Sequence, residues 1–554
     1  MPPKSGKFKK VTYNFSLWNI WVATTLLKVL LFPAYHSTDF DVHRNWLAIT
    51  HNLPLKDWYL EATSQWTLDY PPFFAYFEWF LSQFVPKSVI ADGCLDIVAK
   101  GDYGISTIAF QRTTVIFSEI ILFLSLEYLM RTSPSSQKAR SFVIASSIVL
   151  SPGLFIVDHI HFQYNGMMFG ILIFSIVTAK EKRYLLCGFT FAVLLCFKHI
   201  FLYLAPAYFI FLLRAYCLND VKKFPTNFNQ LINIVLWKNL LKLGGVVLSV
   251  FAICFGPFVY YGVMPNLLAR LFPFSRGLTH AYWAPNIWAL YSFTDRVLIQ
   301  LMLHIPGVSK IITRLAPHAN ELLNSPELLR ESAASTKGLV GEVEFFILPN
   351  IQPSATFLLT LFYQVMSLIP LFINPTFERF IGSLTLCGYA SFLFGWHVHE
   401  KAIMLVIIPF TFIVCQDKRL LPVFQALSSA GYVSLFPLLY GSAEWLFKAL
   451  ITFVWCVIYF SSFGEVAHNY ANFSTRIFLL DRINLIYSIL LIPMSIFVQF
   501  MDIEARNFAI LKKLEFVRLM IYSVYCALGI VGSWNGLSWL YFLDDTIWVK
   551  KDDE

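Results

Sequence analysis

Long apolar stretches recur along the whole chain, and polar residues gather in the segments between them. Examples of these stretches are residues 17–35, 142–157, 240–263 and 485–500. A helix needs about 20 mostly apolar residues to cross a bilayer. The first stretch is long and no small-residue cleavage site follows it, so it differs from a cleaved signal peptide. The pattern therefore predicts an all-α polytopic membrane protein.

The same pattern predicts about fourteen membrane crossings. Those in the second half of the chain are expected at residues 355–373, 380–396, 402–415, 420–441, 447–462, 485–500 and 515–533. Residues 283–303 are also apolar, but they contain Asn286, Asp295 and Arg296. A charge at the bilayer centre costs about 3 kcal/mol. We therefore expect this segment to enter or lie along the membrane without completing a crossing.

Composition and charge agree with this fold class. Of the 554 residues 57% are hydrophobic and 14% are charged, against about 25% charged in soluble chains. Basic residues cluster in the N-terminal tail, at 131–140, at 180–183 and across 214–242, while the turn around Ile200 has only Lys198. The positive-inside rule places the basic loops and both termini in the cytosol. The net charge of +8 is thus a topology signal, and no nucleic-acid partner is expected.

Ionisable residues are dense where the first apolar stretch ends. Residues 37–46 read Ser-Thr-Asp-Phe-Asp-Val-His-Arg-Asn-Trp. At helical spacing Asp39 and His43 share one face, and Asp41 and Arg44 share another. Ser37, Thr38 and Asp39 are all good N-cap types. The spacing alone favours a helix cap with solvated charges, because Asp is a common capping residue. Catalysis by one of these carboxylates is the alternative.

A second polar group, Asp69 and Tyr70, precedes a rigid Pro-Pro turn at 71–72. The aromatic residues of 73–84 then predict an interfacial helix that lies in the headgroup plane. Asp69 could orient the turn or contact a sugar, and the structural role is the more common one for Asp before a turn.

Three further polar segments fall on the same predicted side of the membrane. They are residues 158–166 with His161, residues 270–277 with Arg276, and the run His397-Val398-His399-Glu400-Lys401. A helical zinc site needs His residues four apart, and these are two apart, so a metal is disfavoured. The basic side chains fit a phosphate pocket better, with a rim of snorkelling side chains as the alternative.

Together, residues 37–46, 68–72, 158–166, 270–277 and 397–401 resemble the endoplasmic reticulum glucosyltransferases that use dolichyl-phosphate glucose, which are inverting GT-C enzymes of N-glycan precursor assembly. The resemblance covers essentially the whole chain. The sibling that adds the first glucose typically reads Tyr-Glu-Ala-Gln-Arg-His-Trp where this chain has residues 40–46, and Leu-Thr where it has Phe73-Phe74. In both places the chain looks like the sibling that adds the second, α-1,3-linked glucose.

The resemblance implies a role for each candidate residue. Asp39 would be the catalytic base, and His399, Lys401 and Arg276 would bind the donor phosphate. The supporting residues would be Asp41, His43, Arg44, Asp69, Tyr70, His161 and Glu400. The implied partners are a dolichyl-phosphate-glucose donor, a dolichyl-diphosphate-linked oligosaccharide acceptor and the lipid bilayer. No metal or other cofactor is expected.

It also implies one integral membrane domain of GT-C architecture over residues 1–554, in the endoplasmic reticulum membrane with a luminal active site. The expected segments are a cytosolic tail (1–15), a first transmembrane helix (16–35), a luminal catalytic loop (36–108), transmembrane helices (109–263), a luminal loop with a membrane-associated segment (264–354), transmembrane helices (355–533) and a cytosolic tail (534–554).

A transporter is the hypothesis from a different class, because intramembrane charges also serve transport. Transporters usually have paired halves with broken helices in corresponding places and polar groups near the midplane. This sequence shows neither symmetry nor midplane clustering, since its polar groups fall at one membrane face. The pattern therefore favours an enzyme.

Overall fold

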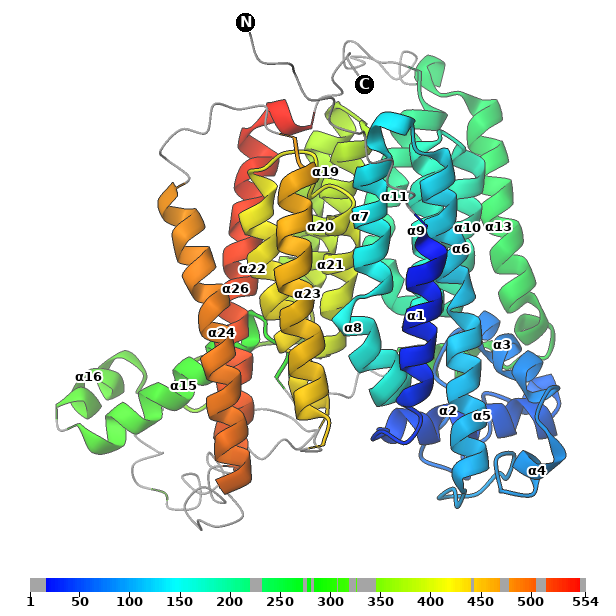
Figure 1. Ribbon diagram of the computed structural model, residues 1–554, viewed down its shortest axis with the longest axis horizontal. Coiled ribbons are helices and arrows are strands. Elements are labelled where there is room, and N and C mark those ends of the chain that lie inside the picture. The colour runs from blue at the N-terminus through cyan, green and yellow to red at the C-terminus, as the bar shows by residue number, and fades with distance from the viewer. Residues whose placement is uncertain are drawn as a thin grey trace, which may run out of the picture.

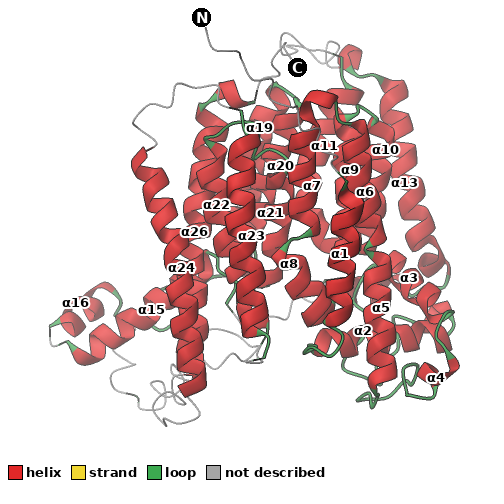
Figure 2. Cartoon of the chain, in the orientation of Figure 1, coloured by secondary structure: helices red, strands yellow, loops and turns green. Residues whose placement is uncertain are grey.

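The computed structural model describes residues 16–219, 232–272, 277–279, 283–305, 307–317, 325, 345–439, 443–468, 478–504 and 515–548. Within these residues the regular structure is helical, apart from two isolated β-bridges. Figure 2 shows helices joined by loops throughout the described part of the chain. The predicted all-α fold class is confirmed for these residues.

The first half of the chain forms an upright helical bundle with a group of short helices at one end (Figure 1). Its elements are α1 (Leu17–Leu30), α2 (Thr38–Asn52), η1 (Leu55–Asp57), α3 (Pro72–Ser82), α4 (Lys87–Ile90), α5 (Ile105–Ser118), α6 (Ile120–Thr132), η2 (Ser135–Gln137), α7 (Lys138–Val149), α8 (Pro152–Leu154), the π-helix η3 (Phe155–Phe162), α9 (Asn165–Lys180), α10 (Tyr184–Phe197), η4 (His199–Leu204), α11 (Ala205–Leu212), the π-helix η5 (Leu213–Cys217) and α13 (Trp237–Tyr260).

The second half adds further upright helices and a short arm. Its elements are α14 (Met264–Leu271), α15 (Ile287–His304), α16 (Val308–Leu315), α19 (Pro353–Ile373), α20 (Phe377–Phe394), η6 (Glu400–Ile403), α21 (Met404–Thr411), α22 (Leu420–Val433), η7 (Phe436–Leu438), α23 (Trp445–Val466), α24 (Phe478–Glu504), α26 (Glu515–Leu543) and η8 (Asp545–Ile547).

Nine helices or continuous helical runs in the described part of the chain are long and apolar enough to cross a membrane. The apolar helices α1, α9 and α10 are shorter, with 14 to 16 residues each. The chain is therefore a multi-pass membrane protein, while the number of fourteen crossings stays a prediction.

The segment at 283–303 forms α15, which is not among those nine spans. Its polar residues have local partners: Asn286 caps the helix, and buried Asp295 accepts hydrogen bonds from the backbone N–H groups of Ile347 and Leu348 at 2.9 and 2.8 Å. With α16 it forms an arm that extends from the bundle in Figure 1. Whether this arm lies along a membrane stays a prediction.

The two ends of the bundle differ in what lies there. At one end, Arg140 contacts His468, Arg419 pairs with Asp544, and Thr376 donates to the carbonyl of Trp548. At the other end lie the short helices α2 to α4 (Figure 1). Successive upright helices therefore bring alternate loops to the same end, as the charge pattern predicts.

Candidate active site

The site begins at the start of α2, where the chain leaves α1. The Ser37 hydroxyl accepts a hydrogen bond from the backbone N–H of Asp39 at 3.1 Å and donates to the carbonyl of His161 at 2.6 Å. Ser37 is therefore the N-cap, and Asp39 is the second residue of the helix. The interpretation of Asp39 as the cap is wrong, because Ser37 occupies that position. The Asp39 carboxylate is thus available for other contacts, and the positive end of the helix favours its charge.

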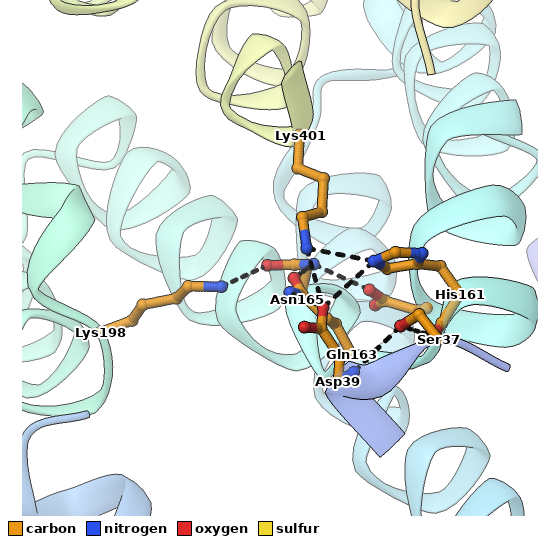
Figure 3. A network of polar contacts seen from close by, with 8 residues as sticks. Ser37, Asp39, His161, Gln163, Asn165, Lys198 and Lys401 are labelled. Carbon is orange, nitrogen blue, oxygen red and sulfur yellow. Dashed lines mark hydrogen bonds and ion pairs between the residues drawn. The ribbon is translucent and has the colours of Figure 1, made fainter. Parts of the chain in front are cut away.

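Three side chains from two distant segments surround one oxygen of Asp39 (Figure 3). Oδ2 accepts from Lys401 Nζ at 2.8 Å and from Gln163 Nε2 at 2.6 Å, and His161 Nε2 lies 3.2 Å away. Lys401 Nζ also lies 3.2 Å from His161 Nε2. Burial alone would raise the pKa of Asp39, but the Lys401 ammonium and His161 outweigh it and hold this pKa well below its usual range. Asp39 is therefore a carboxylate at neutral pH.

The second oxygen of Asp39 remains open. Lys401, Gln163 and His161 all contact the carboxylate at Oδ2, and the Asp39 side chain is 25% exposed. Oδ1 can therefore accept a hydrogen bond from a hydroxyl group of a substrate, while Oδ2 fixes the direction in which the carboxylate points.

His161 lies in the last turn of the π-helix η3, and Gln163 follows this helix directly. π-Helical turns are rare and occur often at functional sites. The helix ends at Phe162, which has a φ of 86°, a strained value for a bulky side chain. Within this π-helix, buried Asp158 accepts from Asn165 Nδ2 at 2.9 Å and from the backbone N–H of Gly166 at 2.5 Å. These bonds fix the turn that presents Gln163.

Lys198 enters the same site from the turn between α10 and η4. Its Nζ donates to Asn165 Oδ1 at 2.9 Å and lies 5.0 Å from the centre of the Tyr70 ring. Figure 3 shows Lys198 and Lys401 reaching Asn165 and Asp39 from different elements. Burial first, and then the Lys401 ammonium, lowers the pKa of Lys198 to about 8.

The sequence prediction omitted Lys198, Gln163 and Asn165 from the site. A signal for Lys198 was present, because it is the only basic residue in a turn that the positive-inside rule expects to be poor in Lys and Arg. Gln163 and Asn165 are uncharged, so nothing in their spacing distinguished them from loop residues.

The other predicted residues of α2 bind partners other than the Asp39 carboxylate. Asp41 accepts a hydrogen bond from the Tyr103 hydroxyl at 2.8 Å. Buried His43 pairs through Nδ1 with Glu78 of α3 at 2.9 Å. Both contacts fix α2 to the rest of the first loop, so these residues position the helix that carries Asp39.

Arg44 has the same kind of role. It is buried, and its Nη1 donates to the carbonyls of Gly93, Cys94 and Asp96 at 3.2, 3.2 and 2.8 Å. The guanidinium thus replaces water for three backbone acceptors of the following loop.

Tyr70, in the predicted turn at 69–72, reaches the site with its aromatic ring. The backbone carbonyl of Tyr70 accepts from the Tyr59 hydroxyl at 2.6 Å, which holds the turn, and the Tyr70 ring faces Lys198. Half-buried Asp69 favours the charged form of Lys198 from a greater distance. The following residues form α3 as predicted, and its exposed Trp79 and Phe80 suit an interfacial helix.

The predicted phosphate-binding residues fall in different places. Lys401 lies in the site, whereas His399 makes a ring contact with His397, at 5.6 Å between centroids. Arg276 lies outside the described residues. The residues just after Arg276 contact the segment that carries Lys401, because the backbone N–H of His397 donates to the carbonyl of Leu278 at 2.9 Å.

Glu400 lies beside Lys401 and is almost fully buried, with 2% of its surface exposed. Neither of its carboxylate oxygens has a hydrogen-bond partner in the described part of the chain. Burial outweighs the nearby Lys401 charge and raises the pKa of Glu400 to about 7.

Comparison with known proteins identifies the family of this chain. A model of the ALG6, ALG8 glycosyltransferase family matches residues 24–537. The chain is 60% identical over 539 residues to the dolichyl pyrophosphate Glc1Man9GlcNAc2 alpha-1,3-glucosyltransferase of Kluyveromyces lactis, which covers 97% of this chain and 96% of that protein. It is 58% identical to the protein of the same name from Saccharomyces cerevisiae over 97% of this chain and 93% of that one. For the one from Neurospora crassa the identity is 50%, over 96% and 99%. The chain therefore belongs to the ALG6, ALG8 glycosyltransferase family.

Proposed function

We propose that this glycosyltransferase moves glucose from dolichyl-phosphate-β-glucose to the terminal glucose of Glc1Man9GlcNAc2 on dolichyl diphosphate, in α-1,3 linkage. The names of relatives that are 50 to 60% identical over nearly the whole chain support this acceptor and linkage. The sibling reaction, addition of the first glucose, is the alternative that the residues at 40–46 and 73–74 disfavour.

The reaction is a single displacement with inversion, because the donor is β-linked and the product is α-linked. Oδ1 of Asp39 takes the proton of the acceptor 3-hydroxyl while that oxygen attacks the anomeric carbon. The observation that carries this role is the arrangement of the carboxylate, with Oδ2 held by Lys401 and Gln163 and Oδ1 open. Partial proton transfer of this kind contributes about 10²–10⁴-fold to the rate.

Lys401 links the base to the leaving group. The departing dolichyl phosphate gains negative charge as its bond to glucose breaks. This charge attracts the Lys401 ammonium, which then interacts with the phosphate as well as with Asp39. Its hold on Asp39 then weakens, so the Asp39 carboxylate becomes a stronger base as the reaction proceeds. His399 and Arg276 are further candidates for the phosphate. The mechanism needs no metal or other cofactor.

The proposed location is the endoplasmic reticulum membrane, with the active site in the lumen and both termini in the cytosol. Supporting it, the basic clusters at 131–140 and 180–183 flank short loops at the end of the bundle opposite to Asp39. The polyprenyl tails of donor and acceptor would stay in the bilayer while their headgroups reach Asp39.

The test uses purified protein with dolichyl-phosphate glucose and lipid-linked oligosaccharides that carry no glucose or one glucose. Wild type should extend the acceptor that carries one glucose. Asp39→Asn should lower kcat by about 10²-fold or more, whereas Asp41→Asn, which loses only a loop contact, should retain far more activity. Extension of only the unglucosylated acceptor would refute the assignment, and near-wild-type turnover by D39N would remove Asp39 as the base. Strong inhibition by a chelator would contradict the metal-free mechanism.

A further inference from the structure

Four buried or half-buried lysines differ in what balances their charge. Lys28 pairs with Glu119 at 2.5 Å, and Lys401 pairs with Asp39 at 2.8 Å. Lys448 donates to two backbone carbonyls. Lys198, by contrast, forms no ion pair with a described carboxylate, and its one hydrogen bond goes to a neutral amide.

The surroundings of Lys198 explain why no carboxylate reaches it. Asp158 is the acid of the same polar network, but its two oxygens accept from Asn165 Nδ2 and from the Gly166 N–H. The Asn165 side chain also donates to Gln163 Oε1 at 2.7 Å, so its own oxygen must face Lys198. The amide thus stands between the ammonium and Asp158. An ammonium group has three N–H donors, and Asn165 takes one of them.

The remaining donors of Lys198 border the site of Asp39. The ring of Tyr70 covers one side of the ammonium, and the segment of Gln163 and Asn165 joins it to Asp39. In Figure 3 the side chains of Lys198 and Lys401 converge on this segment from different parts of the chain. Repulsion between these two cations is part of what disfavours the charge on Lys198. An anion beside them would relieve this repulsion.

In the proposed reaction the negative charge on the donor phosphate increases, and a second cation would stabilise this added charge. The donor phosphate is a diester with one negative charge. When the bond between the anomeric carbon and the phosphate oxygen breaks, both electrons stay on that oxygen, and the released monoester carries up to two charges. The acceptor oxygen bonds to the anomeric carbon, and its proton goes to Asp39. The charge of Lys401 is balanced by its ion pair with Asp39.

We propose that Lys198 binds the donor phosphate together with Lys401, and that its ammonium stabilises the second negative charge of the departing dolichyl phosphate. Lys198 is then a catalytic residue, because it touches the leaving group. Asn165 and Tyr70 position it, the first by a hydrogen bond and the second through its ring face. The proposal rests on the function proposed above and adds a residue that the sequence prediction omitted.

The experiment compares wild type with Lys198→Gln, Lys198→Arg and the control Lys87→Gln, which changes an exposed lysine of α4. Two quantities are measured: the donor and acceptor KM values, and the affinity of each purified protein for a short-chain polyprenyl phosphate. K198Q should weaken polyprenyl phosphate binding and raise the donor KM by about 10- to 100-fold, the usual effect of one charge-assisted hydrogen bond. K198R should keep most of the binding, and K87Q should equal wild type.

Each outcome has one meaning. If wild type does not use dolichyl-phosphate glucose, the proposed function fails. If wild type uses this donor and K198Q binds polyprenyl phosphate as wild type does, the role of Lys198 fails even where kcat falls. A change confined to the acceptor KM also overturns it. If K198Q does not fold, the binding measurement is made on K198R and on Tyr70→Ala instead. Tyr70→Ala removes the ring that positions the ammonium and should also weaken polyprenyl phosphate binding.

Discussion

The Asp39 carboxylate meets two requirements that differ in their effect on its pKa. In the proposed mechanism it must be ionised before the substrates bind, and it must accept a proton during the transfer. Lys401 and Gln163 satisfy the first by binding Oδ2, and the open Oδ1 satisfies the second. A capping Asp would use its oxygens on backbone N–H groups, so the assignment of the cap to Ser37 matters for the chemistry.

A pH dependence follows from Lys198, whose pKa is lowered to about 8 by burial and by Lys401, against the opposing effect of Asp158, Asp39 and Asp69. A bound phosphate favours the protonated ammonium. Donor affinity is therefore complete below this pKa and falls as the pH rises through it. The donor KM of wild type should rise several-fold between about pH 7 and pH 9, measured at saturating acceptor.

The matched variant for this prediction is Lys198→Arg. A guanidinium stays protonated over this range of pH, so K198R should have a donor KM that changes little up to about pH 9. An equal alkaline rise in the donor KM of wild type and K198R would assign the titration to another group.

At the scale of elements, a buried triad supports the start of the site. Glu119, between α5 and α6, accepts from Lys28 of α1 at 2.5 Å and lies 3.1 Å from His159 of η3. All three side chains are buried. The triad therefore connects three elements just before the segment 161–165 that surrounds Asp39.

Removal of one partner from this triad should destabilise the protein strongly. Lys28→Met leaves the Glu119 charge buried without its cation, which costs about 3–5 kcal/mol for a typical buried pair. The unfolding temperature in detergent should therefore fall for K28M. It should recover in part for the double variant K28M/E119Q, in which no unpaired charge remains. A double variant that is less stable than K28M would contradict this account.

Most helices could be predicted from the sequence, but the shape of the site could not. Apolar periodicity predicted the long helices, and the Pro pair at 71–72 predicted the start of α3. The π-helix η3 and the positive φ of Phe162 have no such signal, because an apolar run looks the same in an α- and a π-helix. The position of Gln163 depends on both features, so it could not be predicted.

At the scale of the whole molecule, the helices bring together side chains that are far apart in the sequence. Asp39 meets Gln163 over 124 positions and Lys401 over 362. The charge pattern predicted that these loops share one side of the membrane, and the structure places them at one end of the bundle. Which of the same-side residues touch is set by helix packing, so Lys401 and His399 could not be told apart from spacing alone.

The sidedness of the two ends can be tested by labelling. All nine native cysteines are buried, so a membrane-impermeant maleimide should report mainly on an introduced cysteine. In sealed microsomes with the cytosolic face outward, Ser136→Cys should react at once, because Ser136 is exposed at the basic end. Ala62→Cys, exposed in the first loop, should react only after the membrane is permeabilised. The reverse pattern would invert the proposed topology.

The long separation between Asp39 and Lys401 has a consequence for biosynthesis. A membrane protein is inserted from its N-terminus as it is made, and domains fold as their segments emerge. Asp39 is inserted with the first two helices, and the cation that binds its Oδ2 follows 362 residues later. For most of translation the nascent chain thus carries an incomplete site. The enzyme acquires the carboxylate–ammonium pair of the proposed mechanism only in the last third of synthesis, after most of the bundle is already in the membrane.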